Sequence, residues 1–221
     1  MAVSITNSQI DKLGERLRRG SLSESDLTLL AAYRNSFALP AKAVFDVVSE
    51  LSGLQPAIRS EKTTLSVVAK LKREGIRLSQ MQDMSGCRVT VENLAAQDFL
   101  VMLLLKSFAE SKLYDRCARP THGYRAKHVV VRQSGMWIEI QVRTTAQHGW
   151  AILSENAADV FHQDLKYGVG QKIILMDLDW LSRQIADEEE AGVRFESDQM
   201  MEMIHTVTEL WKQEIQIIKH R

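Results

Sequence analysis

The sequence predicts an α+β fold in which N- and C-terminal helices flank a mixed sheet of about five strands. Apolar residues recur at helical spacing through residues 1–55 and again through residues 171–219. The middle of the chain contains short segments rich in β-branched residues. Between two of these segments, Ser134-Gly135 suits a two-residue hairpin turn, because glycine tolerates the positive φ that such turns need.

Composition limits the class of protein. The 221 residues suffice for one compact domain with helical extensions. Lys plus Arg equals Asp plus Glu at 28 each, so any anion site must be local and nothing indicates a generally basic nucleic-acid binder. Cys87 and Cys117 are too few for a disulfide scaffold or a thiolate metal site. With no apolar leader and no apolar run of membrane-spanning length, we expect a cytoplasmic protein without a membrane partner.

The N-terminal region, residues 1–55, is predicted to be helical. Its first helix ends at Gly20 and carries Arg16, Arg18 and Arg19 in its last turn. These arginines either complement the negative end of the helix dipole or contact a polyanion. Pro40 is expected to kink or divide the second helical stretch.

A basic stripe follows in the segment that begins the central region, residues 56–165. Pro56 to Ser60 is compatible with an edge strand, and a short helix then ends at Gly75. Lys62, Ser66 and Lys70 are spaced at i, i+4 and i+8, which places them on one helix face. Such a stripe is either a solvated helix face or a triphosphate site.

Residues 81–91 are predicted to form a loop that enters a strand. Asp83 stands before the flexible Ser85-Gly86, where aspartate is most often a turn residue, and Arg88 points away from the apolar side of the strand. The expected elements after it are a helix over 93–111, a strand over 112–119, the hairpin, and a helix from Thr144 to about His162.

The second hairpin strand, Met136 to Arg143, alternates strictly between apolar and polar residues. With a two-residue turn, 128 pairs with 141 and 130 with 139. One face then carries His128, Glu139, Gln141 and Arg143. That face is either a solvated outer surface or the floor of an active site.

The C-terminal region, residues 166–221, is predicted to contain two helices, over 171–190 and 197–219. The last has an apolar stripe that consists of Met203, Val207, Leu210, Trp211 and Ile218. This stripe either packs on the same domain or forms a homo-oligomer interface through the C-terminal helices. We expect the three regions to form one compact domain.

Five short motifs follow one another through residues 56–155. They are Arg59-x-x-Lys62-x-x-x-Ser66-x-x-x-Lys70, Asp83-x-x-Gly86-x-Arg88, Gly123-Tyr124-Arg125-x-x-His128, Glu139-x-Gln141-x-Arg143-Thr144 and Trp150-Ala151. Each motif alone is weak evidence. In this order they resemble the synthetase domain of RelA/SpoT-type alarmone synthetases, and the resemblance covers close to half of the chain.

This resemblance implies a sheet related to nucleotidyltransferases and transfer of pyrophosphate from ATP to the ribose 3′-hydroxyl of GDP or GTP with Mg²⁺, giving (p)ppGpp. By motif position, Asp83 and Glu139 are the implied catalytic residues and metal ligands, with Glu139 engaging the attacking hydroxyl as a base or through a second metal. The implied ATP-binding residues are Arg59, Lys62, Ser66, Lys70 and Arg88. The implied acceptor-binding residues are Tyr124, Arg125, His128, Gln141, Arg143 and His148.

Departures from the family pattern concern the acceptor. Ala126 and Lys127 follow Gly-Tyr-Arg where many relatives have serine, and His148 stands where small synthetases often have asparagine. The acceptor therefore stays open between GDP, GTP, an adenine nucleotide and the 3′ end of tRNA, the last two as in toxic relatives with a partner antitoxin. A nucleotide-sensing module without catalysis is a third alternative, against which the intact Asp83 and Glu139 argue. No His-Asp dipeptide occurs, so we expect a synthetase without a hydrolase domain.

Overall fold

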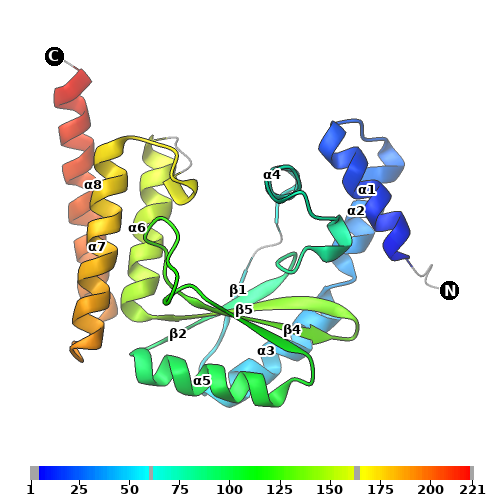
Figure 1. Cartoon of the computed structure of the whole chain (residues 1–221), viewed down its shortest axis with the longest axis horizontal. Coiled ribbons are helices and arrows are strands. Elements are labelled where there is room, and N and C mark those ends of the chain that lie inside the picture. The colour runs from blue at the N-terminus through cyan, green and yellow to red at the C-terminus, as the bar shows by residue number, and fades with distance from the viewer. Residues whose placement is uncertain (1–4, 60–61, 162–164, 220–221) are drawn as a thin grey trace. The chain divides into compact units, whose positions relative to one another are not determined.

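A computed structural model describes residues 5–59, 62–161 and 165–219 (Figure 1). The helices are α1 (Asn7–Arg19), α2 (Glu24–Asn35), α3 (Ala38–Ser52), α4 (Thr64–Glu74), α5 (Leu94–Ser107), α6 (Thr145–Phe161), α7 (Lys172–Glu190) and α8 (Ser197–Lys219), with 3-10 turns η1 (Leu78–Gln80) and η2 (Leu165–Tyr167). The strands β1 (Ala57–Ile58), β2 (Gly86–Val91), β3 (Ser111–Asp115), β4 (Lys127–Gln133) and β5 (Met136–Thr144) form one sheet in the order β1-β2-β5-β4-β3. The predicted α+β class with a mixed five-stranded sheet is confirmed.

The chain divides into two compact units. The first unit consists of Met1–Arg88, Lys106–Lys112 and Val130–Ile140, and the second unit of Val89–Leu105, Leu113–Val129 and Gln141–Arg221. Strands β2, β3, β4 and β5 contribute residues to both. The predicted division into three consecutive regions stays a prediction.

Helix α1 of the first unit is closed by defined caps. Thr6 forms a capping box at its start, and Gly20 takes the left-handed conformation at its end. Arg16 binds both carboxylate oxygens of Asp26 on α2, with Nη2 at 2.6 Å from Oδ1. This ion pair lowers the pKa of Asp26 to about 2. Arg18 donates to the carbonyl of Ile76, so two of the three clustered arginines hold the first unit together.

The helical stretch around Pro40 is divided as predicted. Helix α2 ends at Asn35, and Pro40 lies in the first turn of α3. Proline is tolerated there because the first turn has no intrahelical acceptor for its missing N–H. The expected edge strand is also present as β1, which pairs antiparallel with β2 through Ala57 with Arg88 and Ile58 with Cys87. Ser60 lies outside the described residues.

The hairpin turn is the one that its sequence predicts. Ser134 and Gly135 both have positive φ, 48° and 81°, as a type I′ turn requires. Both faces of β5 are covered: Ile138, Ile140 and Val142 are fully buried, and Glu139, Gln141 and Arg143 are only 8%, 5% and 4% exposed. The interpretation of the polar face as a solvated outer surface is therefore wrong.

Strand β3 is shorter than predicted, because Asp115 ends it. One oxygen of this carboxylate accepts the N–H groups of Cys117 and Ala118 at 2.8 and 2.9 Å, which turns the chain out of the sheet. Residues 116–119 are therefore a turn. Helix α5 also stops earlier than predicted, at Ser107.

Helices α6, α7 and α8 of the second unit lie side by side, with α6 contacting both others (Figure 1). The Trp150 indole donates to the carbonyl of Leu178, and the Trp211 indole donates to Asp177, each at 2.8 Å. Trp211 is 3% exposed, Met203 and Val207 pack beside it, Leu210 is 54% exposed, and the side chain of Ile218 lies outside the described residues. The apolar stripe thus packs within the unit, and the expected subunit interface stays a prediction. His162, at the predicted end of α6, also lies outside the described residues.

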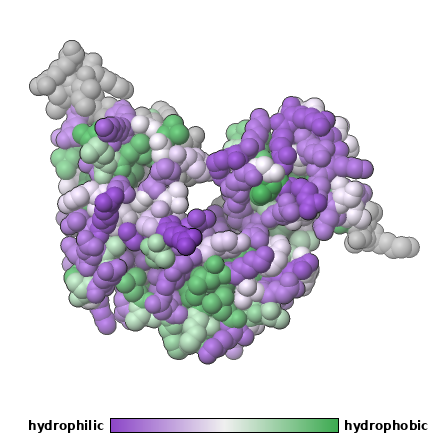
Figure 2. Space-filling view, viewed as in Figure 1, coloured by the Kyte–Doolittle hydropathy of each residue, from purple (hydrophilic) through white to green (hydrophobic). Residues whose placement is uncertain are grey.

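The surface in Figure 2 is mainly hydrophilic, and hydrophobic side chains gather toward the bottom of the view, where α5 lies. Phe99 and Met102 of α5 are 60% and 39% exposed. Among the described residues, no helix combines the length and the apolar composition that crossing a bilayer requires.

Candidate active site

Asp83 lies between η1 and β2 in the first unit, where two lysines meet it. Lys62 Nζ is 2.9 Å from Oδ2, and Lys70 Nζ is 2.9 Å from Oδ1. Only 13% of the Asp83 side chain is exposed. Within the described residues its Oδ1 accepts no hydrogen bond, so the approach of Lys70 is an ion pair alone. A carboxylate that is largely shielded from solvent suits cations as partners, and two lysines take that position here.

Lys62 reaches this carboxylate from outside the helix. Helix α4 begins at Thr64 with Thr63 as its N-cap, so the expectation that Lys62 shares a helix face with Lys70 is wrong. Arg34 of α2 fixes the segment instead, because its Nη2 donates to the Lys62 carbonyl at 2.7 Å. The two lysines still converge on Asp83, as a phosphate site needs.

Ser66 belongs to the first turn of α4. Its N–H donates to the Thr63 hydroxyl at 3.2 Å, and its own hydroxyl accepts from Thr63 at 3.0 Å. The Ser66 side chain is exposed and lies at the positive end of the helix dipole. A phosphate contact by Ser66 is compatible with this position and stays a prediction.

Glu139 of β5 forms an ion pair with Arg59, which follows β1. The backbone fixes both residues: Arg59 N–H donates to the Gly86 carbonyl at 3.1 Å, and Glu139 N–H donates to the Ser85 carbonyl at 3.2 Å. A Cβ atom at Gly86 would lie 2.2 Å from the Glu139 carbonyl oxygen. Position 86 therefore requires glycine, because only glycine lets β2 approach β5 at the catalytic candidate.

Arg59 and Arg88 occupy diagonal positions on one face of the β1–β2 pair. Ala57 lies opposite Arg88 in the β1–β2 register. Arg59 lies two residues after Ala57, opposite Gly86, and its N–H donates to the Gly86 carbonyl. Diagonal neighbours lie roughly 7–8 Å apart. That spacing suits a flat base between two guanidinium planes, since each stacking contact takes about 3.5 Å.

The carboxylates fit a magnesium ion that takes most of its ligands from a substrate. No group of three or more His, Cys, Asp or Glu side chains could hold a metal in the described part of the chain. Mg²⁺ usually needs only one or two carboxylates beside phosphate oxygens and water. Asp83 and Glu139, which are paired with cationic side chains in this structure, would supply such oxygens.

A polar cluster around Tyr124 is the corresponding feature of the second unit. The Tyr124 hydroxyl is 2.9 Å from His128 Nε2 and accepts from Arg143 Nη2 at 2.9 Å. Arg143 Nη2 also donates to Gln141 Oε1 at 3.2 Å, and its Cζ lies 5.1 Å from the centre of the Tyr124 ring. Four of the predicted acceptor-binding residues are thus in one hydrogen-bonded cluster.

Arg143 keeps donors that nothing in the described residues uses. It is 4% exposed, yet its Nε and Nη1 have no hydrogen-bond partner there. Buried N–H donors without acceptors are costly, so Nε and Nη1 favour an anionic ligand such as a phosphate or carboxylate. This is the clearest sign of a binding function in the second unit.

Helix α7 holds the turn that presents Tyr124. Ser182 donates to the Gly123 carbonyl at 2.6 Å and accepts from Arg125 Nε at 3.1 Å. A Cβ atom at Gly123, whose φ is 83°, would lie 2.7 Å from the Trp150 ring. Ser182 was not predicted from the sequence, because it lies far along the chain from the turn that it binds.

Arg125 is engaged within the second unit. Besides Ser182, it donates from Nη1 to the Cys117 carbonyl at 3.0 Å. These bonds brace the turn, and direct binding of the acceptor by Arg125 stays a prediction. His148 lies half-buried on α6, and its assignment to the acceptor stays a prediction as well.

A buried amide network, also missed from the sequence, fixes the end of β5 that follows Gln141. Gln97 Nε2 donates to the Val142 carbonyl and to Gln147 Oε1, both at 2.8 Å. Gln147 Nε2 donates to Glu189 at 3.4 Å. Burial raises the pKa of Glu189. The Gln97 bond holds the backbone carbonyl that precedes Arg143 and so restrains the direction of its side chain.

Comparison with known proteins agrees with these features. Residues 59–163 match the family model described as the region found in RelA/SpoT proteins. Over 110 residues the chain is 32% identical to an uncharacterized protein of Mycobacterium tuberculosis, covering 48% of this chain and 40% of that protein. The chain thus spans less than half the length of the curated relatives that it matches.

Two solved structures share the fold. The small alarmone synthetase 1 from Bacillus subtilis, bound to its product pppGpp, aligns with a TM-score of 0.56 and 21% identity over 71% of this chain and 93% of that one. A GTP pyrophosphokinase family protein from Streptococcus pneumoniae aligns with a TM-score of 0.55 and 20% identity over 86% and 97%. Residues 59–163 are thus similar to the region found in RelA/SpoT proteins, and the chain has the fold of the small alarmone synthetases.

Proposed function

We propose that this chain is a pyrophosphokinase that transfers pyrophosphate from ATP to the ribose 3′-hydroxyl of GDP or GTP, producing (p)ppGpp. The observation that carries the proposal is the pairing of cations with the two candidate catalytic carboxylates in the first unit. Lys62 and Lys70 meet Asp83, and Arg59 meets Glu139. Phosphoryl-type transfer needs such positioned charges far more than covalent chemistry.

On the donor side, Lys62 and Lys70 bind phosphate oxygens of ATP, and Arg59 and Arg88 hold the adenine between them. Asp83 would hold Mg²⁺, which would supply charge compensation for the phosphate oxygens that repel the attacking oxygen. The two ion pairs support this assignment, because they bring Lys62 and Lys70 together at Asp83.

On the acceptor side, Tyr124 provides the flat surface for the base, and Arg143 binds an acceptor phosphate through Nε and Nη1. His128 and Gln141 hold the Tyr124 and Arg143 side chains in place. Glu139 accepts the proton of the 3′-hydroxyl while the oxygen of that hydroxyl bonds to the β-phosphorus of ATP. The bond between the β-phosphorus and the bridging oxygen breaks, and AMP leaves with that oxygen.

The test is an acceptor panel with ATP labelled in its β-phosphate. The protein is incubated with Mg²⁺ and GDP, GTP, deacylated tRNA or no further acceptor, and the products are separated. We expect label on the guanosine nucleotides and none after chelation of the metal. Label on tRNA would assign the toxic alternative, label on adenine nucleotides alone would assign an adenine alarmone, and ATP binding without transfer would leave a sensing module.

A further inference from the structure

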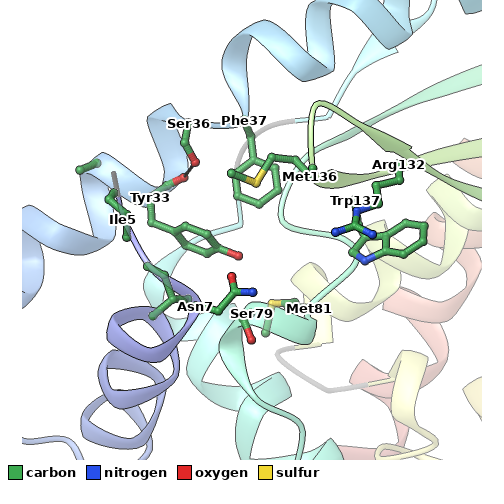
Figure 3. A pocket seen from close by; sticks show the side chains of 13 residues that line it. Ile5, Asn7, Tyr33, Ser36, Phe37, Ser79, Met81, Arg132, Met136 and Trp137 are labelled. Carbon is green, nitrogen blue, oxygen red and sulfur yellow. Dashed lines mark hydrogen bonds between the residues drawn. The ribbon is translucent and has the colours of Figure 1, made fainter. Parts of the chain in front are cut away.

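A cavity of about 520 Å³ lies in the first unit, apart from the residues assigned to pyrophosphate transfer (Figure 3). Its walls come from α1, from the end of α2 and the segment that joins it to α3, from η1 and the residue after it, and from the tip of the β4–β5 hairpin. Its volume falls within the range of roughly 300–1,000 Å³ that is usual for small-molecule sites.

Aromatic and sulfur-containing side chains form part of a mixed apolar and polar lining. Tyr33, Phe37 and Trp137 supply rings, and Met81 and Met136 supply thioethers. Tyr33, Phe37 and Met81 are 7%, 4% and 1% exposed, so the deep part of the cavity is a fixed surface. Flat rings and polarizable sulfur atoms are the surfaces that an aromatic ring contacts best.

Polar groups lie at both ends of this apolar lining. In Figure 3 the hydroxyl of Tyr33 and the side-chain amide of Asn7 point toward one another at one end. Arg132 and Trp137 lie together at the other. Such convergent polar groups orient a ligand in a mainly apolar pocket.

The charged side chains at the Trp137 end favour an anion. Arg132 Cζ and Lys112 Nζ lie 5.7 and 4.9 Å from the centre of the Trp137 ring. Arg132 is the one charged residue among the described residues that line the cavity. Its Nη1 is 3.2 Å from Glu110 Oε2 in an exposed pair, and such a pair contributes little, so the guanidinium can turn toward a ligand.

We propose that this cavity is a second ligand site, for a flat aromatic molecule that bears one anionic group. The ring of the ligand lies among Tyr33, Phe37 and Met136, and its anion binds Arg132 at the Trp137 end. Guanidinium groups favour such ligands because they form charge-assisted hydrogen bonds with oxyanions.

The cavity adjoins both segments that carry candidate catalytic carboxylates. Trp137 and Glu139 share one face of β5, and Met81 precedes Asp83 by two residues. A ligand in the cavity therefore acts on turnover through these segments, as an effector. Only this consequence depends on the proposed transfer activity; the ligand site itself does not.

The test measures two fluorescent probes without any nucleotide: 8-anilinonaphthalene-1-sulfonate, and its uncharged analogue N-phenyl-1-naphthylamine. Arg132→Gln should raise the Kd of the sulfonate by about tenfold and leave the uncharged probe unchanged. Glu110→Gln should strengthen sulfonate binding, because it frees Arg132 from its competing carboxylate. Trp137→Leu should weaken both probes.

Trp180→Leu is the matched control, because Trp180 is a 59% exposed tryptophan on α7 of the second unit. It should leave both Kd values unchanged. The proposal is overturned if the wild-type protein binds neither probe, if Arg132→Gln and Trp137→Leu bind like wild type, or if Trp180→Leu alone weakens binding. Thermal melts confirm that each variant is folded. A failed transfer assay would leave these binding results intact, so the two proposals fail separately.

Discussion

The proposed donor side in the first unit and the proposed acceptor side in the second unit differ in how their charged groups are paired. In the first unit, Asp83 and Glu139 are each neutralised by cations that are also assigned to ATP. In the second unit, buried Arg143 has donors that no described residue uses. ATP with its metal must therefore exchange internal ion pairs, whereas an acceptor anion meets donors already held in place. The difference predicts separate mutational signatures for the two substrates.

Asp83→Asn should have the largest effect and tests the donor side. The amide keeps the shape of the side chain but removes the charge that binds Mg²⁺ and pairs with Lys62 and Lys70. We expect transfer to be abolished in a folded protein, as steady-state assays and a thermal melt would show. Asp46→Asn is the matched control, since Asp46 pairs with Lys42 on an exposed helix face, and it should keep normal turnover. Normal turnover in Asp83→Asn would refute the metal assignment.

Glu139→Gln should lower turnover by a factor on the order of 10²–10⁴, the usual contribution of general acid–base catalysis. ATP affinity should be nearly retained, because adenine and phosphate binding use other side chains. Transfer kinetics beside calorimetric ATP binding measure both quantities. Glu209→Gln, which removes an exposed carboxylate paired with Lys212, controls for loss of charge. A variant that keeps more than about a tenth of normal activity would show that Glu139 is a binding residue only.

Tyr124→Ala tests the proposed acceptor side. It should raise the acceptor KM by about tenfold or more, since base stacking on an aromatic ring contributes about 1–3 kcal/mol. ATP affinity should hardly change. Tyr124→Phe keeps the ring and loses only the hydroxyl shared by His128 and Arg143, so its effect should be smaller. If the affinities for the acceptor and for ATP fall equally in Tyr124→Ala, Tyr124 has a structural role and does not distinguish the acceptor side from the donor side.

Ser182→Ala should give the smallest effect, because Ser182 positions the Tyr124 turn without touching a substrate. Loss of its bond to the Gly123 carbonyl costs about 1 kcal/mol. We expect a few-fold rise in the acceptor KM, with kcat at saturating acceptor and the KM for ATP unchanged. Ser25→Ala on exposed α2 is the control. A fall in kcat without any change in KM would argue against a positioning role.

Local chemistry explains which parts of the fold could be predicted from the sequence. The β4–β5 turn was predictable because its conformation depends only on the two residues Ser134 and Gly135, and glycine favours the positive φ of such a turn. The end of α4 at Gly75 was predictable for the same reason. The end of β3 was not predictable in this way. It depends on the Asp115 carboxylate, which accepts the N–H groups of Cys117 and Ala118, and the alternation of apolar and polar residues does not reveal such contacts.

The candidate site was predictable only as a set of motif positions. Spacing could suggest that Lys62 and Lys70 act together, yet it suggested a shared helix face, whereas they meet at Asp83 from a loop and a helix. Ser182 and the Gln97–Gln147–Glu189 network carried no sequence signal. Their roles arise from contacts between segments that are distant along the chain, and only folding brings these segments together.

The most direct test of the account is a crossed measurement of both KM values in two variants. Lys70→Gln removes a donor-side cation that meets Asp83, and Arg143→Gln removes the acceptor-side guanidinium. The account predicts that Lys70→Gln raises the KM for ATP by about tenfold, a change of ~1.4 kcal/mol, and leaves the acceptor KM unchanged. Arg143→Gln should raise the acceptor KM and leave the KM for ATP unchanged. If the buried glutamine prevents folding, Arg143→Lys, which keeps the charge, is the variant to measure instead. Equal shifts of both KM values in both variants would contradict the division of the site into a donor side and an acceptor side.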